Sequence, residues 1–387
     1  MTDLQPFRIK VPDRAIERIR ARVAAYPWHE MPDDGGWDYG TNLAYMKALC
    51  AYWVEDFDWR KQEAALNRFP HFIAPVGGLD LHFIHEKGTR ANGGGSAPLP
   101  LLISHGWPGS IVEFLEVIGP LAHPERFGGR AEDAFDVVAP SLPGFGLSGR
   151  PPRPYGPRRM AGLFNELMTG VLGYQGYLAQ GGDWGGAISS WLGFEHAPAC
   201  RAIHLNIMTM HHPDGPQTPE EEAWAERFAH EQVMEEGYRT QQATRPQTLS
   251  YAMMDSPVGI AAWIIEKFKS WSDIEGDDLE SAHSKDLLLT NIMVYILTRS
   301  FNTASWIYYG RREEGGRTLS RDGRRVEVPT ACALFPAEML AWPPRSYVER
   351  LYNVRRWTEM PRGGHFAALE APELLIEDIR AFARTLR

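Results

Sequence analysis

The chain has 387 residues, a length that suits a single α/β core carrying an inserted subdomain. Its net charge of -9, without a basic cluster, argues against a nucleic-acid partner and an anionic membrane surface. The start of the chain lacks a signal-peptide pattern and no apolar run approaches transmembrane length, so we expect no membrane anchor. Three widely spaced cysteines favour neither a disulfide framework nor a metal site and suit a cytoplasmic location.

The N-terminal segment, residues 1–75, predicts helices and is rich in aromatic side chains. A pattern that begins at Pro12 puts Ile19 and Val23 on one helix face, and a second helical pattern covers residues 43–54. These helices are too few to close a core of their own. We therefore interpret the segment as a lobe that wraps around the main domain.

Residues 76–210 predict strands that alternate with helices, which is typical of a mostly parallel sheet with right-handed crossovers. A glycine-rich loop at residues 88–97 follows the first strand. The expected strands are residues 79–85, 99–104, 135–140, 176–180 and 202–208.

The alternation stops in residues 211–310, where the pattern is helical, so we expect an inserted helical lid. Its expected helices are residues 220–236, 259–271 and 286–297. The core resumes in residues 311–387, with strands at 326–334 and 354–358. A final amphipathic helix carries Leu375, Ile379, Phe382 and Leu386 on one face.

The most informative motif is the glycine-flanked sequence around Asp183, which follows an apolar strand and opens a helix. It has the form of a nucleophile elbow in which a carboxylate replaces the usual serine. Gly181 and Gly185 would allow the strand and the helix to approach closely. A carboxylate that attacks a saturated carbon forms an ester, and water can cleave an ester, so epoxides and alkyl halides are the expected substrates. Taken alone, the motif fits an aspartate that caps a helix equally well.

An α/β-hydrolase arrangement requires an acid and then a histidine later in the chain. His365 lies in a glycine-flanked loop between the last strand and the last helix, where the general base is expected. Glu338 follows the preceding strand and would orient the imidazole. The backbone N–H groups of Trp107 and Trp184 are candidates for the oxyanion hole.

Several motifs together resemble the microsomal-type epoxide hydrolase family over nearly the full length of the chain. They are HGWPGS at residues 105–110, GGDWGG at 181–186, RGGHFA at 362–367, FDWR at 57–60, LNRFP at 66–70 and DSPVG at 255–259. The resemblance implies an α/β-hydrolase fold, a lid and an N-terminal domain of the epoxide hydrolase type. We expect no cofactor and no metal, because a carboxylate ester itself splits a hard step into two easier ones.

The resemblance also implies two lid tyrosines that protonate the epoxide oxygen. They correspond to Tyr238 and Tyr308. Trp306 and Ile307 stand where the family commonly has an arginine and an aromatic residue, so Tyr309 stays open as the second tyrosine.

The expected activity is hydrolysis of an apolar or aromatic small-molecule epoxide to a vicinal diol, in detoxification or in secondary metabolism. We expect Trp263, Trp306 and Tyr309 to line the substrate pocket. A haloalkane dehalogenase with the same nucleophile and a catalytically silent ligand-binding protein are the alternatives. A homodimer is the default expectation for such an enzyme.

Overall fold

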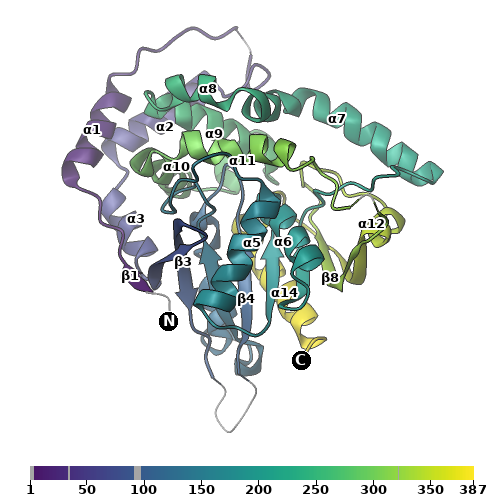
Figure 1. Ribbon diagram of the computed structural model, residues 1–387. Coiled ribbons are helices and arrows are strands. Elements are labelled where there is room, and N and C mark those ends of the chain that lie inside the picture. Colours follow the sequence, from purple (N-terminus) through teal and green to yellow (C-terminus); the bar gives the residue numbers. More distant parts are fainter. Residues whose placement is uncertain (1–3, 34, 91–96, 321) are drawn as a thin grey trace.

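The computed structural model describes residues 4–33, 35–90, 97–320 and 322–387 (Figure 1). Most of the glycine-rich loop expected at residues 88–97 lies outside the described residues. The described strands form one sheet of nine in the order β1-β2-β3-β5-β4-β6-β7-β8-β9. Their bounds are β1 Gln5–Phe7, β2 His71–Val76, β3 Leu79–Glu86, β4 Leu99–Ser104, β5 Phe135–Pro140, β6 Tyr177–Gly181, β7 Cys200–Leu205, β8 Val326–Leu334 and β9 Tyr352–Glu359.

The sheet is mostly parallel, as the alternating pattern predicted. Strands β1, β2, β3 and β5 pair in antiparallel fashion, and every pairing from β5 to β9 is parallel. Strand β4 lies between β5 and β6, with Leu101 opposite Val137 on one side and Leu178 on the other. Apolar residues run through these central strands because helices cover both faces of the sheet.

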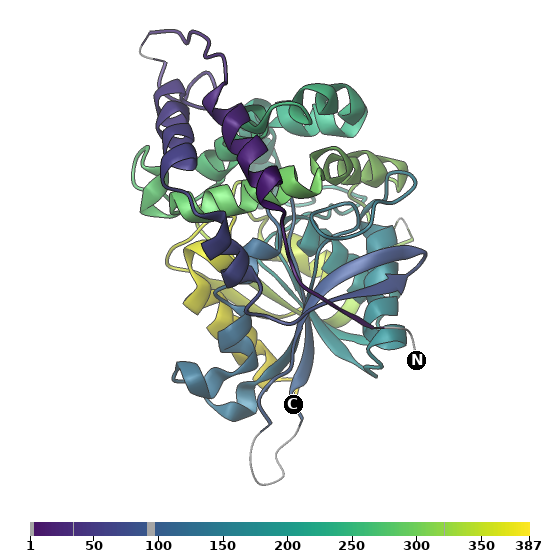
Figure 2. The ribbon, with the colours of Figure 1, turned by 90° about the vertical axis from the view of Figure 1, so that its left-hand side faces the viewer.

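Helices α5 (Pro157–Glu166) and α6 (Asp183–Glu195) cover one face, and α4 (Ile118–Ala122) and α14 (Pro372–Arg384) cover the other (Figure 2). The C-terminal helix buries Leu375, Ile379 and Phe382, whereas Leu386 lies beyond its end and is half-buried. The remaining core helices are α12 Arg345–Leu351 and α13 Ala367–Glu370.

The expected lid is a group of helices above the carboxyl ends of the strands (Figure 1). They are α7 Pro219–Thr244, α8 Pro246–Met253, α9 Pro257–Trp271, α10 Lys285–Thr298 and α11 Phe301–Glu313. Helix α11 continues past residue 310, where the sequence suggested a boundary. Within the described ranges, no helix has both the length and the apolar character needed to cross a membrane.

The N-terminal segment contributes both helices and sheet. Its helices are α1 Asp13–Ala24, α2 Leu43–Glu55 and α3 Trp59–Leu66, while β1 pairs with β2 at the edge of the sheet. The expected boundary after residue 75 falls inside β2. Several contacts join this segment to the lid, among them Thr41 to the carbonyl of Ala262 at 2.7 Å, Tyr52 to Asp286 at 2.9 Å, and Arg22 to Asp255 at 2.8 Å. The segment therefore connects the lid to the sheet.

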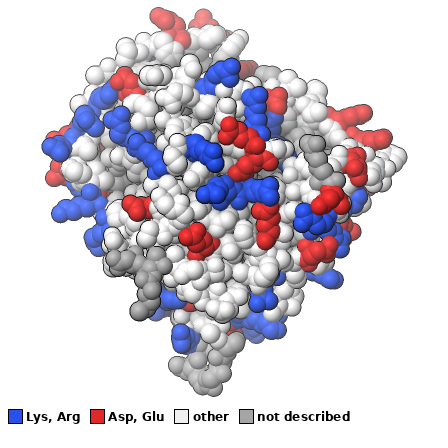
Figure 3. All heavy atoms as spheres, in the orientation of Figure 1, with Lys and Arg blue, Asp and Glu red and all other residues white. Residues whose placement is uncertain are grey.

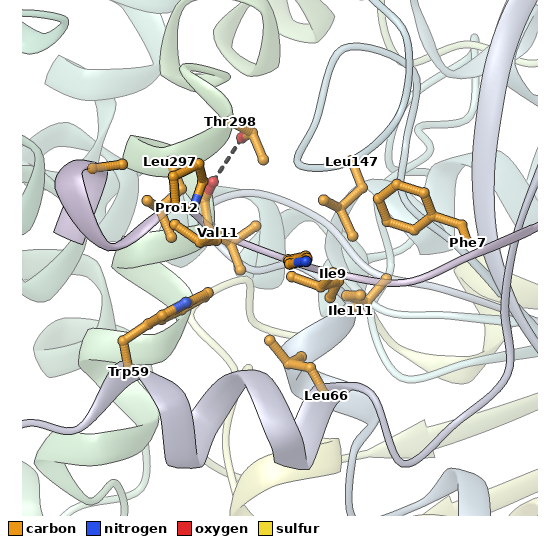
Figure 4. Close-up of a pocket in the computed structure, with 13 residues that line it drawn as sticks. Phe7, Ile9, Val11, Pro12, Trp59, Leu66, Ile111, Leu147, Leu297 and Thr298 are labelled. Carbon is orange, nitrogen blue, oxygen red and sulfur yellow. Dashed lines mark hydrogen bonds between the residues drawn. The ribbon is translucent and has the colours of Figure 1, made fainter.

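An apolar cavity of about 240 Å³ lies where the N-terminal segment meets α10 and the core (Figure 4). Phe7, Ile9, Trp59 and Leu66 line it from the N-terminal side, and Ile111 lines it from the core. None of the residues that line it is one of the predicted catalytic residues.

Acidic and basic side chains are interspersed on the face of the molecule seen in Figure 3. Such a mixed surface does not form the basic stripe that nucleic-acid binding uses.

Candidate active site

Asp183 is the first residue of α6 and directly follows the turn from β6. Its φ of 43° lies in the left-handed region, which non-glycine residues seldom adopt. Gly182, not Asp183, is the N-cap residue of α6. The Asp183 carboxylate instead accepts a hydrogen bond from the backbone N–H of Trp107, in the loop after β4. This geometry is that of a nucleophile elbow and not that of a helix-capping aspartate.

The glycines beside Asp183 are required by close backbone contacts. A Cβ atom on Gly181 would lie 2.1 Å from the carbonyl carbon of Gly185. A Cβ atom on Gly185 would lie 1.8 Å from the backbone oxygen of Ser104 in β4. These distances are shorter than any van der Waals contact, so only glycine fits at either position. The tight turn predicted from the motif is present for this reason.

Two backbone N–H groups act on the Asp183 carboxylate. The N–H of Trp107 lies 2.7 Å from Oδ1. The N–H of Trp184 also interacts with the carboxylate and favours its charged form. These are the two residues expected to form the oxyanion hole, and they converge on the same carboxylate.

His365 and Glu338 lie beside Asp183 at the carboxyl ends of β9 and β8. His365 Nδ1 is 2.9 Å from Oε1 of Glu338, and its Nε2 is 3.6 Å from Oδ2 of Asp183. The side chains of His365 and Glu338 are only 3% and 1% exposed. Glu338 therefore fixes the imidazole so that Nε2 points towards Asp183, the arrangement of an acid, a base and a nucleophile.

The pKa values of this group follow from burial and neighbouring charge. Burial lowers the pKa of His365, but the charges of Glu338 and Asp183 outweigh burial and raise the pKa to about 9. Burial raises the pKa of Asp183, while His365 and the N–H group of Trp107 oppose that rise. The two neighbouring charges therefore act in opposite directions to burial: His365 favours the charged form of Asp183, and Asp183 favours the charged form of His365.

Tyr238 from α7 and Tyr308 from α11 meet above the two tryptophans. The Tyr238 ring stacks on Trp107 with centroids 5.2 Å apart, and the Tyr308 ring meets Trp184 edge-on at 4.7 Å. The two tyrosine rings are 5.8 Å apart. The buried hydroxyl of Tyr308 has no hydrogen-bond partner among the described residues. Both phenols, together with Asp183, line one cavity of about 30 Å³.

Three other residues expected in the pocket do not line the two cavities at Asp183, and their place in the substrate pocket stays a prediction. Trp263 donates a hydrogen bond of 3.2 Å to Gln242, and Trp306 donates one of 3.2 Å to Asn302. These tryptophans and Tyr309 are absent from the described lining of the cavities at Asp183. Successive residues of a helix are about 100° apart, so Trp306 and Tyr309 cannot share the face of Tyr308.

A half-buried carboxyl that sequence reasoning missed lines a second cavity at Asp183. Glu113, in a 3-10 turn at Ile111–Phe114, lines a cavity of about 20 Å³ together with Asp183 and His365. Burial raises the pKa of Glu113 to about 8, and the charge of His365 opposes the rise. The available signal in the sequence was a glutamate, one of two, inside an otherwise apolar stretch after the HGWPGS motif.

The cavity above Asp183 also contains three arginines that were not predicted. Arg239 comes from α7, Arg311 comes from α11 and Arg317 comes from the segment that follows α11. Lysine and arginine are scattered through the sequence, so their convergence has no local signal.

Comparisons with known proteins agree with this geometry. Residues 4–114 match the family model described as "Epoxide hydrolase N terminus", and residues 100–273 match the model "alpha/beta hydrolase fold". The solved structure of the juvenile hormone epoxide hydrolase of the silkworm Bombyx mori superposes with a TM-score of 0.87. That structure is 28% identical, and the match covers 100% of this chain and 96% of the other. The fold is therefore the α/β-hydrolase fold.

Two relatives cover almost the whole chain. "Epoxide hydrolase 1" of Sus scrofa is 35% identical over 98% of this chain and 88% of its own length. A protein of Stigmatella aurantiaca, named provisionally as an epoxide hydrolase, is 41% identical over 99% of this chain and 86% of its own length. Identity at this level, over this share of both sequences, shows that the chain belongs to the microsomal-type epoxide hydrolase family.

Proposed function

We propose that this protein hydrolyses a small-molecule epoxide to a vicinal diol through a covalent ester on Asp183. The observation that carries the proposal is the convergence of Asp183, His365 and Glu338 beneath the phenols of Tyr238 and Tyr308. A carboxylate nucleophile, a histidine base and two proton donors are the groups that a two-step opening of an epoxide requires.

In the first step, Oδ2 of Asp183 attacks an epoxide carbon and the ring C–O bond breaks. Oδ2 is the attacking atom because Oδ1 is held by the N–H of Trp107. The released alkoxide takes a proton from Tyr238 or Tyr308. The two hydroxyls line the same cavity as Asp183, so they can contact the epoxide oxygen.

In the second step, His365 Nε2 removes a proton from water, and the hydroxide attacks the carbonyl carbon of the ester. The bond from that carbon to Oδ2 then breaks, and the leaving alkoxide takes the proton of the new carboxylic acid, which releases the diol and restores the Asp183 carboxylate. The carbonyl oxygen that gains charge is Oδ1, which the N–H groups of Trp107 and Trp184 stabilise. Formation of the ester removes the negative charge of Asp183, which otherwise raises the pKa of His365. The imidazolium can then return a proton to the tyrosinate that the first step leaves, and the neutral imidazole acts as the base.

The test is a single turnover of styrene oxide in heavy-oxygen water by the wild-type protein and by Asp183→Asn. Asparagine is the matched replacement because it tolerates the left-handed backbone of residue 183. We expect diol whose new oxygen comes from the Asp183 carboxylate, and no diol from the variant. Diol labelled from solvent in the first turnover would contradict the ester mechanism, and bromide release from a bromoalkane would favour a dehalogenase.

We also propose a cytoplasmic location, which the three buried free cysteines support. A homodimer stays a prediction.

A further inference from the structure

Three guanidinium groups line the cavity in which the epoxide would react. Arg239, Arg311 and Arg317 share this lining with Asp183 and Tyr308. Positive charges gathered around a cavity of about 30 Å³ repel one another, and burial weakens the screening that water would provide. A neutral, apolar substrate would form no charge–charge contact with these three arginines.

The counter-charges available to these arginines are few. Arg239 pairs with Glu236, three residues earlier on α7. Arg311 lies over the indole of Trp184, with its guanidinium carbon 4.5 Å from the ring centroid. Within the described parts of the chain, no carboxylate lies within salt-bridge distance of Arg311 or Arg317.

The neighbour of Arg317 adds no negative charge either. Its Nη1 lies 3.3 Å from Nε2 of His211. Burial and the charges of Arg317 and Arg311 lower the pKa of His211 to about 4, so this histidine is neutral at pH 7. Burial, with the charges of Arg311 and Arg239, lowers the pKa of Arg317 to about 9, which leaves the guanidinium charged at pH 7. Asp183 lines the same cavity and Glu236 pairs with Arg239, so these carboxylates offset two of the three guanidinium charges, and the cavity keeps an excess of positive charge.

The arginines are also close to the reacting atoms. Tyr308 and Arg311 are three residues apart on α11, so their Cβ atoms are about 5–6 Å apart on the same helix face. Arg311 contacts the indole of Trp184, the residue that follows the nucleophile. A group joined to the epoxide through a few bonds would reach the guanidinium of Arg311 while the epoxide oxygen contacts Tyr308.

We infer that the substrate carries a carboxylate a few bonds from its epoxide ring, and that Arg311 and Arg317 bind this carboxylate. The inference rests on the proposed epoxide hydrolase activity and defines its substrate class. Planar guanidinium groups match carboxylate oxygens in geometry as well as in charge. Trp184, Met339 and Leu340 supply the apolar part of the same lining, so the substrate combines an apolar body with an anionic end.

The probes are a matched pair of aryl epoxides, 4-(oxiran-2-yl)benzoate and its neutral methyl ester. The quantity measured is the ratio of their kcat/KM values. For the wild-type protein we expect this ratio to favour the carboxylate at least about tenfold, which corresponds to about 1.4 kcal/mol. Higher ionic strength should raise KM for the carboxylate alone, because salt screens the attraction between the charges.

The variants are Arg311→Gln and Arg317→Gln, with Arg312→Gln as the control. Arg312 is exposed and lies next to Arg311 on α11, so its replacement removes the same charge away from the cavity. We expect the ratio to fall at least about tenfold in the first two variants. In the control the ratio should stay at the wild-type value. An unchanged ratio in both cavity variants would overturn the inference.

A binding measurement separates this inference from the proposed function. Asp183→Asn is titrated with the benzoate epoxide, alone and combined with Arg311→Gln, and the Kd is determined by calorimetry. If the wild-type protein hydrolyses the ester at least as well as the benzoate, the inference fails and the epoxide hydrolase activity stands. If neither probe is hydrolysed but Arg311→Gln weakens binding about tenfold, the anion site stands and the proposed reaction fails.

Discussion

A Cβ atom on Gly106 would lie 1.9 Å from Oδ1 of Asp183, so the loop after β4 packs tightly against this carboxylate. This contact aligns the neighbouring N–H of Trp107 with the same oxygen at 2.7 Å. Gly106→Ala should therefore displace the carboxylate and lower kcat for epoxide hydrolysis by about 10²-fold, the loss that a displacement of about 1 Å causes.

The matched control for that substitution is Gly162→Ala. Gly162 lies on α5, and a Cβ atom there would have no neighbour within 4 Å. We expect wild-type kcat and an equal or higher melting temperature, since alanine favours a helix. Wild-type activity in Gly106→Ala would contradict the close contact with Asp183.

The two tyrosines of the cavity should act as proton donors, and their neighbour should not. Tyr238→Phe and Tyr308→Phe should each slow ester formation, and the double variant should lose about 10²–10⁴-fold, the range of general acid catalysis. Stopped-flow quenching of tryptophan fluorescence measures this step. Tyr309→Phe is the control, because Tyr309 is absent from the described lining of the cavity. A larger effect of Tyr309→Phe than of Tyr308→Phe would show that the neighbouring tyrosine is the donor.

Glu338→Gln should slow the second step more than the first. The amide keeps the size of the side chain but removes the charge that stabilises the imidazolium at Nδ1 of His365. We expect hydrolysis of the ester to slow by about 10²–10⁴-fold, so that covalently modified protein accumulates. Mass spectrometry of quenched reactions measures the fraction of protein that carries the ester. Glu359→Gln, an exposed acid at the end of β9, is the control and should not accumulate ester.

The same ion pair should make stability depend on pH. Burial lowers and Glu338 raises the pKa of His365, with a net rise from 6.5 to about 9. Because the folded state binds the proton more tightly, this stabilisation is complete below pH 6.5 and is lost as the pH rises through about 9. This stabilisation of the folded state is at most about 3 kcal/mol. Urea unfolding of the wild-type protein and of Glu338→Gln, from pH 6.5 to about 9, measures how much of it is lost. Parallel pH curves for the two proteins would contradict the prediction.

Glu113 should make the stability of the folded protein depend on pH, because the folded state keeps its carboxyl protonated. Burial raises its pKa from 4.5 to about 8, so the folded carboxyl stays neutral where the unfolded one ionises. The free energy of unfolding should therefore fall as the pH rises from 4.5 to 8, by at most about 5 kcal/mol. Glu113→Gln removes this titration, and the variant should be more stable than wild type at pH 9. Equal stability at pH 9 would show that Glu113 is not buried as a neutral acid.

The sequence by itself was sufficient for the parts of the molecule that depend on local patterns. Strand β8 has the predicted bounds, Val326–Leu334, because a short apolar run between turns is a local signal. Asp183 was found because a strand, a glycine turn and a helix follow one another directly in the chain. His365 and Glu338 were found because each follows its own strand, and the ends of parallel strands meet at one edge.

Only the tertiary structure decided which side chains face Asp183. Tyr308 and Tyr309 are adjacent in the sequence, and packing of α11 against α7 and the core turns only Tyr308 into the cavity. No motif in the sequence around Glu113 indicates that it lies beside Asp183, because the residues that enclose it come from distant segments. Arg239, Arg311 and Arg317 converge from separate parts of the lid and core.

The physical reason is that some structural features depend on neighbouring residues in the chain, whereas others depend on packing between distant elements. Backbone sterics and hydrophobic periodicity act over a few residues, so they can be read from the sequence. The face that a lid helix turns inward depends on the free energy of packing all its neighbours at once. The tight turn at Asp183 was therefore predictable, whereas the charge of the cavity above it required the folded arrangement.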